Sequence, residues 1–211
     1  MKLYYAPGAC SLAPHIALEE VGVPFELSRV DLAHNQQGST EYRRINPKGR
    51  VPALVDGDWV LTEAPAILRY IAARHPAVAL WPWDPREEAR CAEWLNWLSS
   101  TVQVAFVHVR RAARYAADPR AVEDVASTAK KTSHDLWQTI DQKIGQGPWA
   151  LGNRYSVVDL LLMAHWLWGR GPVLGFDMER ECPRWTEHAQ RLAARPAVQR
   201  AFTSEGLTLP S

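Results

Sequence analysis

The stretch from Asn46 to Ile67, which reads NPKGRVPALVDGDWVLTEAPAI, decides the fold of this 211-residue chain. Two apolar runs, at 51–55 and 59–61, flank Asp56-Gly57-Asp58, a turn signal that predicts an antiparallel hairpin. Apolar residues then recur with a helical period over residues 63–73. Together these patterns predict a strand–strand–helix unit.

The residues before this unit alternate between strand and helix signals. Residues 1–6 and 25–32 have strand character, and between them residues 11–21 form a helical pattern that stops at Gly22. Residues 34–45 are polar and irregular, which predicts a short distorted helix. A strand–helix–strand start places the first two strands in parallel, so the order β-α-β then β-β-α predicts an α/β domain.

The residues after this unit change in character near position 80. Prolines at 76, 82 and 85 block both helix and central strand, which predicts a linker. Beyond it only helical patterns recur, over residues 87–117 (one helix or two), 120–144, 156–168 and 185–194. The sequence therefore predicts an α/β domain over 1–76, a proline-rich linker over 77–86, and an all-helical domain over 87–211.

Composition and charge exclude several classes of protein. Hydrophobic residues make up 47%, which argues against a disordered or collagen-like chain. Lysine and arginine number 24 against 23 acidic residues, so a nucleic-acid or anionic-membrane partner has little support. The cluster of Arg110, Arg111 and Arg114 is most simply a solvated helix face. No run approaches the ~20 apolar residues of a membrane span, and the N-terminus does not resemble a signal peptide.

The cysteines and histidines show no metal-binding or disulfide pattern. The three cysteines, at positions 10, 91 and 182, are odd in number and far apart, and the seven histidines lack zinc-site spacing. We therefore expect no bound metal and a reducing cytoplasmic compartment.

Cys10 is the first candidate for chemistry. It lies just ahead of the first predicted helix, where backbone N–H groups and the helix dipole favour a thiolate and lower its pKa. A lone cysteine is otherwise most often a small buried hydrophobe. No second cysteine follows within the motif, so any redox cycle would need an outside thiol.

Two further motifs suit a peptide-like ligand. Val51-Pro52 is a candidate for a cis bond that turns the Val51 backbone outward beside Cys10, although a plain edge-strand proline is the simpler interpretation. Glu63 and the N–H of Ala64 lie at a helix start, where a carboxylate and free donors could clamp an α-amino-acid end. The alternative is that Glu63 merely favours the helix start.

A fourth motif is structural on either interpretation. Ser156 and Asp159 match a capping box, and Tyr155 with Leu160 matches a hydrophobic staple. The pair predicts the start of a buried helix.

These four elements, in this order, resemble the glutathione transferase family over the whole chain. The opening residues 1–20, the stretches 46–54 and 61–67, and residues 195–199 resemble the bacterial beta class in particular. The resemblance implies a thioredoxin-like N-terminal domain, a helical C-terminal domain, and a cytoplasmic homodimer active in detoxification. It also implies glutathione as co-substrate, with no permanently bound cofactor.

The resemblance assigns roles to individual residues. Cys10 would face the glutathione sulfur, with Tyr5 and Ser11 as the nearest hydroxyls. The peptide itself would be bound by the other residues that match the family pattern, which are Asn35, Val51, Pro52, Glu63 and Ala64. The polar stripe Asn96, Ser100 and Gln103 on the first long helix would also face glutathione.

Two positions depart from the family pattern. Gln103 stands where many beta-class members have a histidine, and glutamine cannot titrate. His108 lies about 140° around the helix from it and is a poor substitute. Ala64 replaces a frequent Ser or Gly, so the backbone donor survives while a hydroxyl contact does not.

The electrophile site is less constrained by the sequence. Phe106, Trp166 and Trp168 are candidates to line an apolar pocket, although aromatic stripes usually form core. The leading hypothesis is a transferase that joins the glutathione thiolate to hydrophobic electrophiles. The alternatives are a glutathione-dependent disulfide reductase that uses Cys10, and a largely non-catalytic ligand-binding adaptor, which the Gln103 departure would favour.

Overall fold

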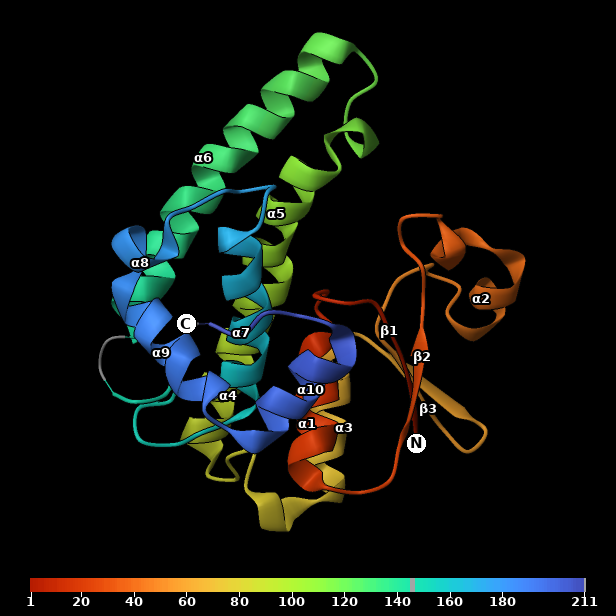
Figure 1. Ribbon diagram of the computed structural model, residues 1–211, viewed down its shortest axis with the longest axis vertical. Helices are drawn as coiled ribbons and strands as arrows, with labels where there is room; N and C mark the ends of the chain where they lie inside the picture. Colours follow the sequence, from red (N-terminus) through yellow and green to blue (C-terminus); the bar gives the residue numbers. More distant parts are fainter. Residues whose placement is uncertain (145–146, 211) are drawn as a thin grey trace.

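A computed structural model describes residues 1–144 and 147–210, and its N-terminal part is built on a four-stranded sheet (Figure 1). The strands are β1 (Lys2–Tyr5), β2 (Glu26–Arg29), β3 (Ala53–Asp56) and β4 (Trp59–Thr62), in the order β2-β1-β3-β4. β1 pairs in parallel with β2 and antiparallel with β3, and β3 pairs antiparallel with β4. The predicted parallel pairing of the first two strands and the predicted hairpin are confirmed.

Helices cover this sheet in the manner of a thioredoxin-like domain. α1 (Leu12–Val21) and α3 (Ala64–Arg74) lie between the sheet and the helical half, whereas α2 (Thr40–Ile45) lies on the far side (Figure 1). α1 ends at Gly22, whose φ of 68° is a left-handed conformation that glycine adopts without a Cβ penalty. The irregular segment before α2 forms a short 3₁₀ turn, η1 (Gln36–Gly38).

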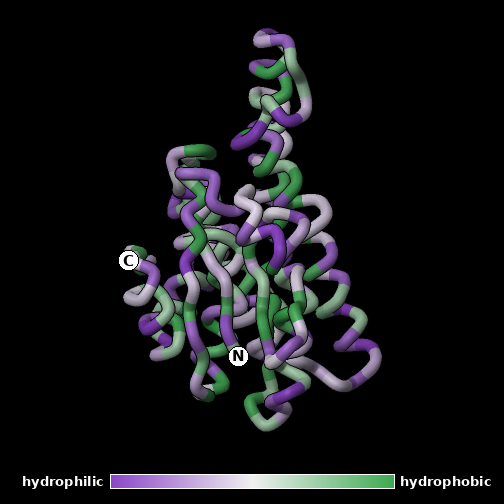
Figure 2. Tube along the Cα trace, turned by 90° about the vertical axis from the view of Figure 1, so that its right-hand side faces the viewer, coloured by the Kyte–Doolittle hydropathy of each residue, from purple (hydrophilic) through white to green (hydrophobic). Residues whose placement is uncertain are grey.

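The rest of the described chain is helical, as predicted. A 3₁₀ turn, η2 (Pro76–Val78), leads to α4 (Pro85–Trp97), α5 (Gln103–Arg110), α6 (Pro119–Ile144), α7 (Val157–Arg170), α8 (Met178–Glu181), α9 (Pro183–Ala193) and α10 (Pro196–Glu205). The sequence analysis missed the short α8. The upper halves of α5 and α6 form a tower that rises above the body, with hydrophilic and hydrophobic residues mixed along it (Figures 1 and 2).

The segment predicted as one helix or two over 87–117 is interrupted in an informative way. α4 and α5 are joined by a π-helical turn, η3 (Leu98–Val102), and a 3₁₀ turn, η4 (Ala112–Arg114), follows α5. In a π turn each bond spans five residues instead of four, so the residues after it are rotated by roughly 100° from their α-helical positions. This rotation decides which polar side chains reach the functional site.

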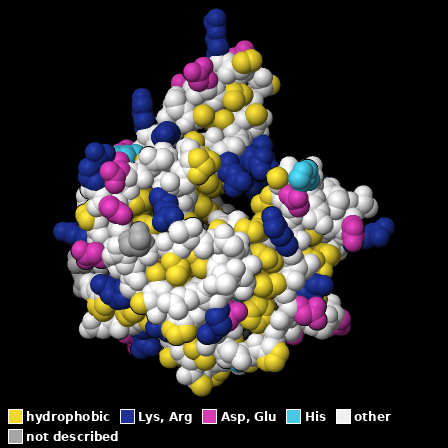
Figure 3. Space-filling view, in the orientation of Figure 1, with side chains coloured by type: hydrophobic (Ala, Val, Ile, Leu, Met, Phe, Trp, Pro, Cys, Tyr) yellow, Lys and Arg dark blue, Asp and Glu magenta, His cyan; other side chains and the backbone are white. Residues whose placement is uncertain are grey.

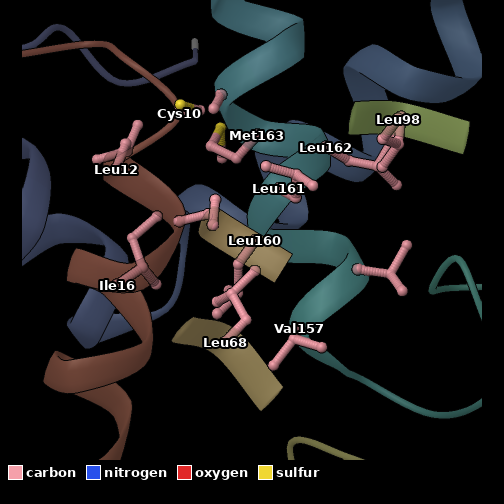
Figure 4. Close-up of a cluster of buried hydrophobic side chains, with 14 of the residues drawn as sticks. Cys10, Leu12, Ile16, Leu68, Leu98, Val157, Leu160, Leu161, Leu162 and Met163 are labelled. Carbon is pink, nitrogen blue, oxygen red and sulfur yellow. The ribbon is translucent and has the colours of Figure 1, made fainter. Parts of the chain in front are cut away.

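α7 is the central element of the core. Its side chains pack against α1, α3 and Leu98, and Cys10 lies at the edge of this cluster (Figure 4). The predicted capping box of Ser156 and Asp159 begins the helix. Asp159 also makes contacts outside the capping box. Its Oδ1 accepts hydrogen bonds from the Ala150 N–H and His188 Nε2, both at 2.8 Å. A buried carboxylate with this many donors is stabilised in place.

Within the described residues, no helix is long and apolar enough to cross a membrane.

Candidate functional site

Cys10 lies in the loop between β1 and α1, two residues before the helix begins. Its side chain is 9% exposed, and its S–H donates to the carbonyl oxygen of Val51 at 3.5 Å. Gln103 on α5 approaches from the helical half, with Nε2 donating to Sγ at 3.8 Å. The thiol is therefore held between the two halves of the chain.

Burial raises the pKa of the Cys10 thiol to about 11, and the bond from Gln103 only partly opposes this effect. The expectation that the helix start lowers this pKa is therefore wrong, because the thiol is removed from water before the dipole can stabilise its anion. At neutral pH Cys10 is a neutral S–H, which makes it a hydrogen-bond donor.

The loop that faces Cys10 is fixed by hydrogen bonds from neighbouring side chains. The Val51–Pro52 bond is cis, which confirms the candidate geometry over the simpler edge-strand interpretation. The Tyr42 hydroxyl and the Asn46 amide both donate to the carbonyl of Arg50, at 2.7 and 2.6 Å. These two bonds fix the approach of the chain to Val51.

Glu63 has an unusual backbone conformation at the start of α3. Its φ of 72° and ψ of 117° are rarely adopted by residues other than glycine, and such conformations cost of order 1–3 kcal/mol. Its carbonyl accepts the first helical bond, from Ile67. The carboxylate turns outward and meets Lys48 Nζ at 2.6 Å. Strain of this kind clusters at ligand sites.

These parts meet in one small cavity, which we name the Cys10 cavity. It has a volume of about 70 Å³ and is lined by Cys10, Asn46, Arg50, Val51, Pro52, Glu63, Ala64, Pro65, Ser99 and Gln103. Six of these were candidates from the sequence. Asn46, Arg50 and Pro65 were missed although they lie inside the quoted motifs, and Ser99 was missed although it lies one helical turn before Gln103.

The Ser11 hydroxyl, expected beside the sulfur, is turned away from this cavity. The Ser11 hydroxyl is fully buried and bonds both the N–H and the carbonyl of Ala6, at 3.1 and 3.2 Å. Tyr5 is also buried, with its ring 5.8 Å from that of His15. The expectation for Ser11 is corrected, because its hydroxyl bonds the interior of the loop, whereas Tyr5 is absent from the cavity lining and its role stays a prediction.

The predicted polar stripe is also divided. Gln103 reaches the cavity, but Asn96 and Ser100 are exposed and do not line it. The reason is the π turn, which rotates Gln103 away from the line through Asn96 and brings Ser99 inward. Asn35 is likewise outside the cavity, on an exposed loop where its Oδ1 accepts a bond from Gln37.

A second cavity lies on the other side of the β1–α1 loop, and we name it the Trp168 cavity. It has a volume of about 450 Å³ and is lined by Gly8, Phe106, Arg110, Leu167, Trp168, Arg170, Gly171, Pro172, Val173, Gly206, Leu207 and Thr208. The rings of Phe106 and Trp168 stack with centroids 4.5 Å apart. The Trp168 indole also donates to the Gly8 carbonyl at 2.8 Å.

Trp166 does not belong to this cavity. It is 3% exposed, its indole donates to Thr186 on α9, and it is absent from the cavity lining. Its bond to α9 directs the indole into the core and away from this cavity. The expectation for Trp166 is corrected to core packing.

The last helix holds the loop that separates the two cavities. Glu205, at the end of α10, accepts bonds from His15 Nδ1 at 2.8 Å and from the Gly8 N–H at 2.9 Å. All three partners are buried or partly buried. The loop that carries Cys10 is therefore fixed from a residue near the C-terminus.

Across residues 1–144 and 147–210, no cluster of three or more His, Cys, Asp or Glu side chains could hold an ion.

Comparison with known proteins gives one consistent result. The chain matches the family descriptions "Glutathione S-transferase, N-terminal domain" over residues 1–73 and "Glutathione S-transferase, C-terminal domain" over residues 99–196. It is 33% identical to glutathione S-transferase GstA of Escherichia coli O157:H7, over 98% of this chain and 100% of that protein.

Solved structures agree with the sequence relatives. A glutathione transferase homologue from Sulfitobacter, determined with bound glutathione, has a TM-score of 0.91 and 36% identity, covering 98% of both chains. The bacterial beta-class glutathione S-transferase of Sphingomonas chungbukensis has a TM-score of 0.83 and 36% identity, covering 99% of this chain and 100% of that one.

Proposed function

This chain belongs to the glutathione transferase family, and from that premise we propose that it joins the glutathione thiolate to hydrophobic electrophiles. The sulfur attacks an electrophilic carbon and forms an S–C bond, while the thiol proton passes to solvent. In a substitution the leaving group departs with its bonding electrons. Detoxification of reactive compounds is the role that this chemistry suits.

The observation that carries the proposal is the composition of the Cys10 cavity. One cavity contains a thiol donor, the backbone of Val51, and a strained Glu63 at a helix start. A volume of about 70 Å³ admits only a few non-hydrogen atoms, so most of a bound tripeptide would lie outside it.

Each part of glutathione has a suitable partner in this arrangement. The Cys10 S–H, directed at present to Val51, would donate to the glutathione sulfur and stabilise its thiolate. Val51 would pair its backbone with the cysteinyl unit. The Glu63 carboxylate would bind the ammonium of the γ-glutamyl end, and the Ala64 N–H and Arg50 guanidinium would bind carboxylates.

Two features bear on the alternative functions. A Cys10 pKa of about 11 leaves little thiolate at neutral pH, which weighs against Cys10 as the nucleophile of a disulfide reductase. Gln103 still donates to the sulfur although it cannot titrate. The adaptor alternative depends only on the presence of Gln103 where many beta-class members have a histidine.

We also propose that the enzyme is a cytoplasmic homodimer. Trp59 and Trp83 are 45% and 50% exposed and pack against Tyr70 and Arg69, neighbours on α3. Large exposed aromatic side chains next to one helix are typical of an interface. The three free, buried cysteines suit a reducing compartment.

The test is steady-state conjugation of glutathione to 1-chloro-2,4-dinitrobenzene across pH, with the wild type, Cys10→Ala and Glu63→Gln. We expect turnover in the wild type, a kcat about tenfold lower in Cys10→Ala, and a raised KM for glutathione in Glu63→Gln, since each loses a hydrogen bond to a charged ligand group.

Matched controls are Cys91→Ala, which removes a buried thiol outside the cavity, and Glu93→Gln, which neutralises an exposed carboxylate on α4. Normal glutathione binding without turnover of any electrophile would favour the adaptor. Equal effects of the Cys10 and Cys91 variants would contradict the role of Cys10.

A further inference from the structure

The Trp168 cavity has an unbalanced charge that the proposed function leaves unexplained. Its floor is apolar, with the stacked rings of Phe106 and Trp168, yet two arginines, Arg110 and Arg170, are part of its lining. The lining contains no acidic side chain. Figure 3 shows Lys and Arg side chains gathered around the hollow between the α5–α6 tower and the N-terminal half.

Neither arginine is neutralised within the protein. Over the described residues, no carboxylate lies within ion-pair distance of either guanidinium. The recorded contact of Arg170 is with the ring of Trp166, 5.1 Å from the guanidinium carbon. Burial, followed by the charge of Arg111, lowers the pKa of Arg110, and no acidic neighbour opposes that shift. Both arginine side chains are exposed, so each guanidinium is open to an anion that enters the cavity from solvent.

Resting on the proposed transferase function, we propose that the electrophile of this enzyme is an anionic aromatic compound. Its ring lies against Phe106 and Trp168, and its carboxylate pairs with Arg110 and Arg170. A cavity of about 450 Å³ suits a single substituted ring. The planar guanidinium fork is the side chain best matched to a carboxylate.

The location of the two arginines suggests a rival explanation. Arg110 is the last residue of α5 and Arg170 is the last residue of α7, so both helix C-termini lie at this cavity. A cation at a helix C-terminus is favourable by itself. That explanation predicts a contribution to stability and no preference for charged substrates, so substrate charge distinguishes the two.

The reaction with such a substrate is an ordinary aromatic substitution. With 4-chloro-3,5-dinitrobenzoate, the glutathione sulfur bonds to the carbon that carries chlorine. The C–Cl bond breaks, chloride leaves with its electron pair, and the thiol proton goes to solvent. The carboxylate lies at the opposite end of the ring and does not react, so its charge reports on binding alone.

The test compares this benzoate with its uncharged methyl ester, at saturating glutathione. The quantity measured is the ratio of kcat/KM for the acid to kcat/KM for the ester, in each variant relative to the wild type, which cancels the intrinsic reactivity of the two compounds. We expect the ratio to fall about tenfold in Arg110→Gln and in Arg170→Gln, the usual effect of one lost charge-assisted bond.

Two further variants separate charge from packing. Arg110→Lys keeps the charge and should retain a ratio between those of the wild type and Arg110→Gln. Arg114→Gln removes an exposed arginine from the same tower, outside this cavity, and should leave the ratio unchanged. An unchanged ratio in both Arg110→Gln and Arg170→Gln, or an equal fall in Arg114→Gln, overturns the proposal.

Failure of the proposed function would look different. If the wild type turns over neither compound, the transferase hypothesis for this pair of electrophiles fails, and the anion site is then decided by binding. Quenching of tryptophan fluorescence gives the Kd of the benzoate and of the ester directly. Tighter binding of the benzoate, lost in Arg110→Gln, supports the site, and equal affinities overturn it.

Discussion

The Cys10 cavity and the Trp168 cavity lie on either side of one loop, yet they are built differently. The Cys10 cavity is small and consists largely of backbone and short side chains from the β1–α1 loop, the Val51 loop and the start of α3. The Trp168 cavity is more than six times larger, at about 450 against about 70 Å³, and is formed by the ends of α5 and α7 and by residues 206–208.

The difference teaches which part of the enzyme is fixed and which part is free to vary. The Cys10 cavity depends on backbone positions held by buried bonds, such as those to the Arg50 carbonyl. Substitutions there would disturb the fold. The Trp168 cavity is shaped by side chains at helix ends, which can be exchanged with little effect on packing. Under the proposed function, the choice of electrophile would therefore belong to the second cavity.

The strongest way to break the comparison is to remove the residue that holds the β1–α1 loop, which contributes Gly8 to one cavity and Cys10 to the other. Glu205→Ala leaves His15 Nδ1 and the Gly8 N–H without their acceptor. We expect a loss of about 3 kcal/mol in the free energy of unfolding, measured by urea denaturation, because buried donors are left unpaired. Both glutathione binding and conjugation should weaken together.

The matched control for this variant is Glu187→Ala, which removes an exposed carboxylate from α9 and should change stability by under about 0.5 kcal/mol. A loss below about 1 kcal/mol in Glu205→Ala would show that the loop is held by other contacts.

The next largest effect concerns the Cys10 cavity alone. With a pKa of about 11 against a usual 9.0, the Cys10 thiolate is about 100-fold scarcer near pH 7.5 than that of an unburied thiol. Alkylation by iodoacetamide should therefore be slow and should rise until about pH 11. The pKa of Cys10 is raised in the folded state. The contribution of its protonated thiol to the free energy of unfolding is therefore complete below pH 9 and is lost as the pH rises through about 11.

Cys10→Ala gives the background of this measurement, because burial also raises the pKa of both Cys91 and Cys182, to about 12. Rapid Cys10-dependent alkylation at pH 7 would contradict the buried thiol.

A smaller effect concerns the Trp168 cavity. Trp168→Ala removes the stacked partner of Phe106 and the bond to the Gly8 carbonyl. We expect kcat/KM for the electrophile to fall about tenfold, since one hydrogen bond and an aromatic contact are lost. The KM for glutathione should change less. Tyr115→Ala, which removes a half-exposed aromatic ring outside both cavities, is the control. Equal changes in both constants would mean that the two cavities are not separable.

The smallest effect concerns the entrance to the Cys10 cavity. Lys48 forms an ion pair with the Glu63 carboxylate, the group to which the ammonium of glutathione would bind. Both side chains are exposed, so the pair contributes little to stability. Lys48→Met should lower the KM for glutathione about twofold, with Lys131→Met, an exposed lysine on α6, as the control. A raised KM would show instead that Lys48 binds glutathione.

Much of this fold and part of the site could be predicted from local sequence patterns. The hairpin, the Gly22 stop and the capping box are short-range signals whose chemistry is complete within a few residues, and each appears as predicted. The Cys10, Val51 and Glu63 positions followed from motifs in the same way. The π turn was not predictable by periodicity, which assumes a constant rise and rotation, and it divided the polar stripe around Gln103.

The sequence by itself determined the order of the elements, the family, and the residues whose backbone forms the Cys10 cavity, because turn, cap and helix-start chemistry is local. Tertiary structure alone decided the pKa of Cys10, the inward orientation of Ser11, the contact between Glu205 and Gly8, and the pairing of Arg110 with Arg170 around one cavity. These properties depend on desolvation and on contacts between residues far apart in the chain, which no local pattern records.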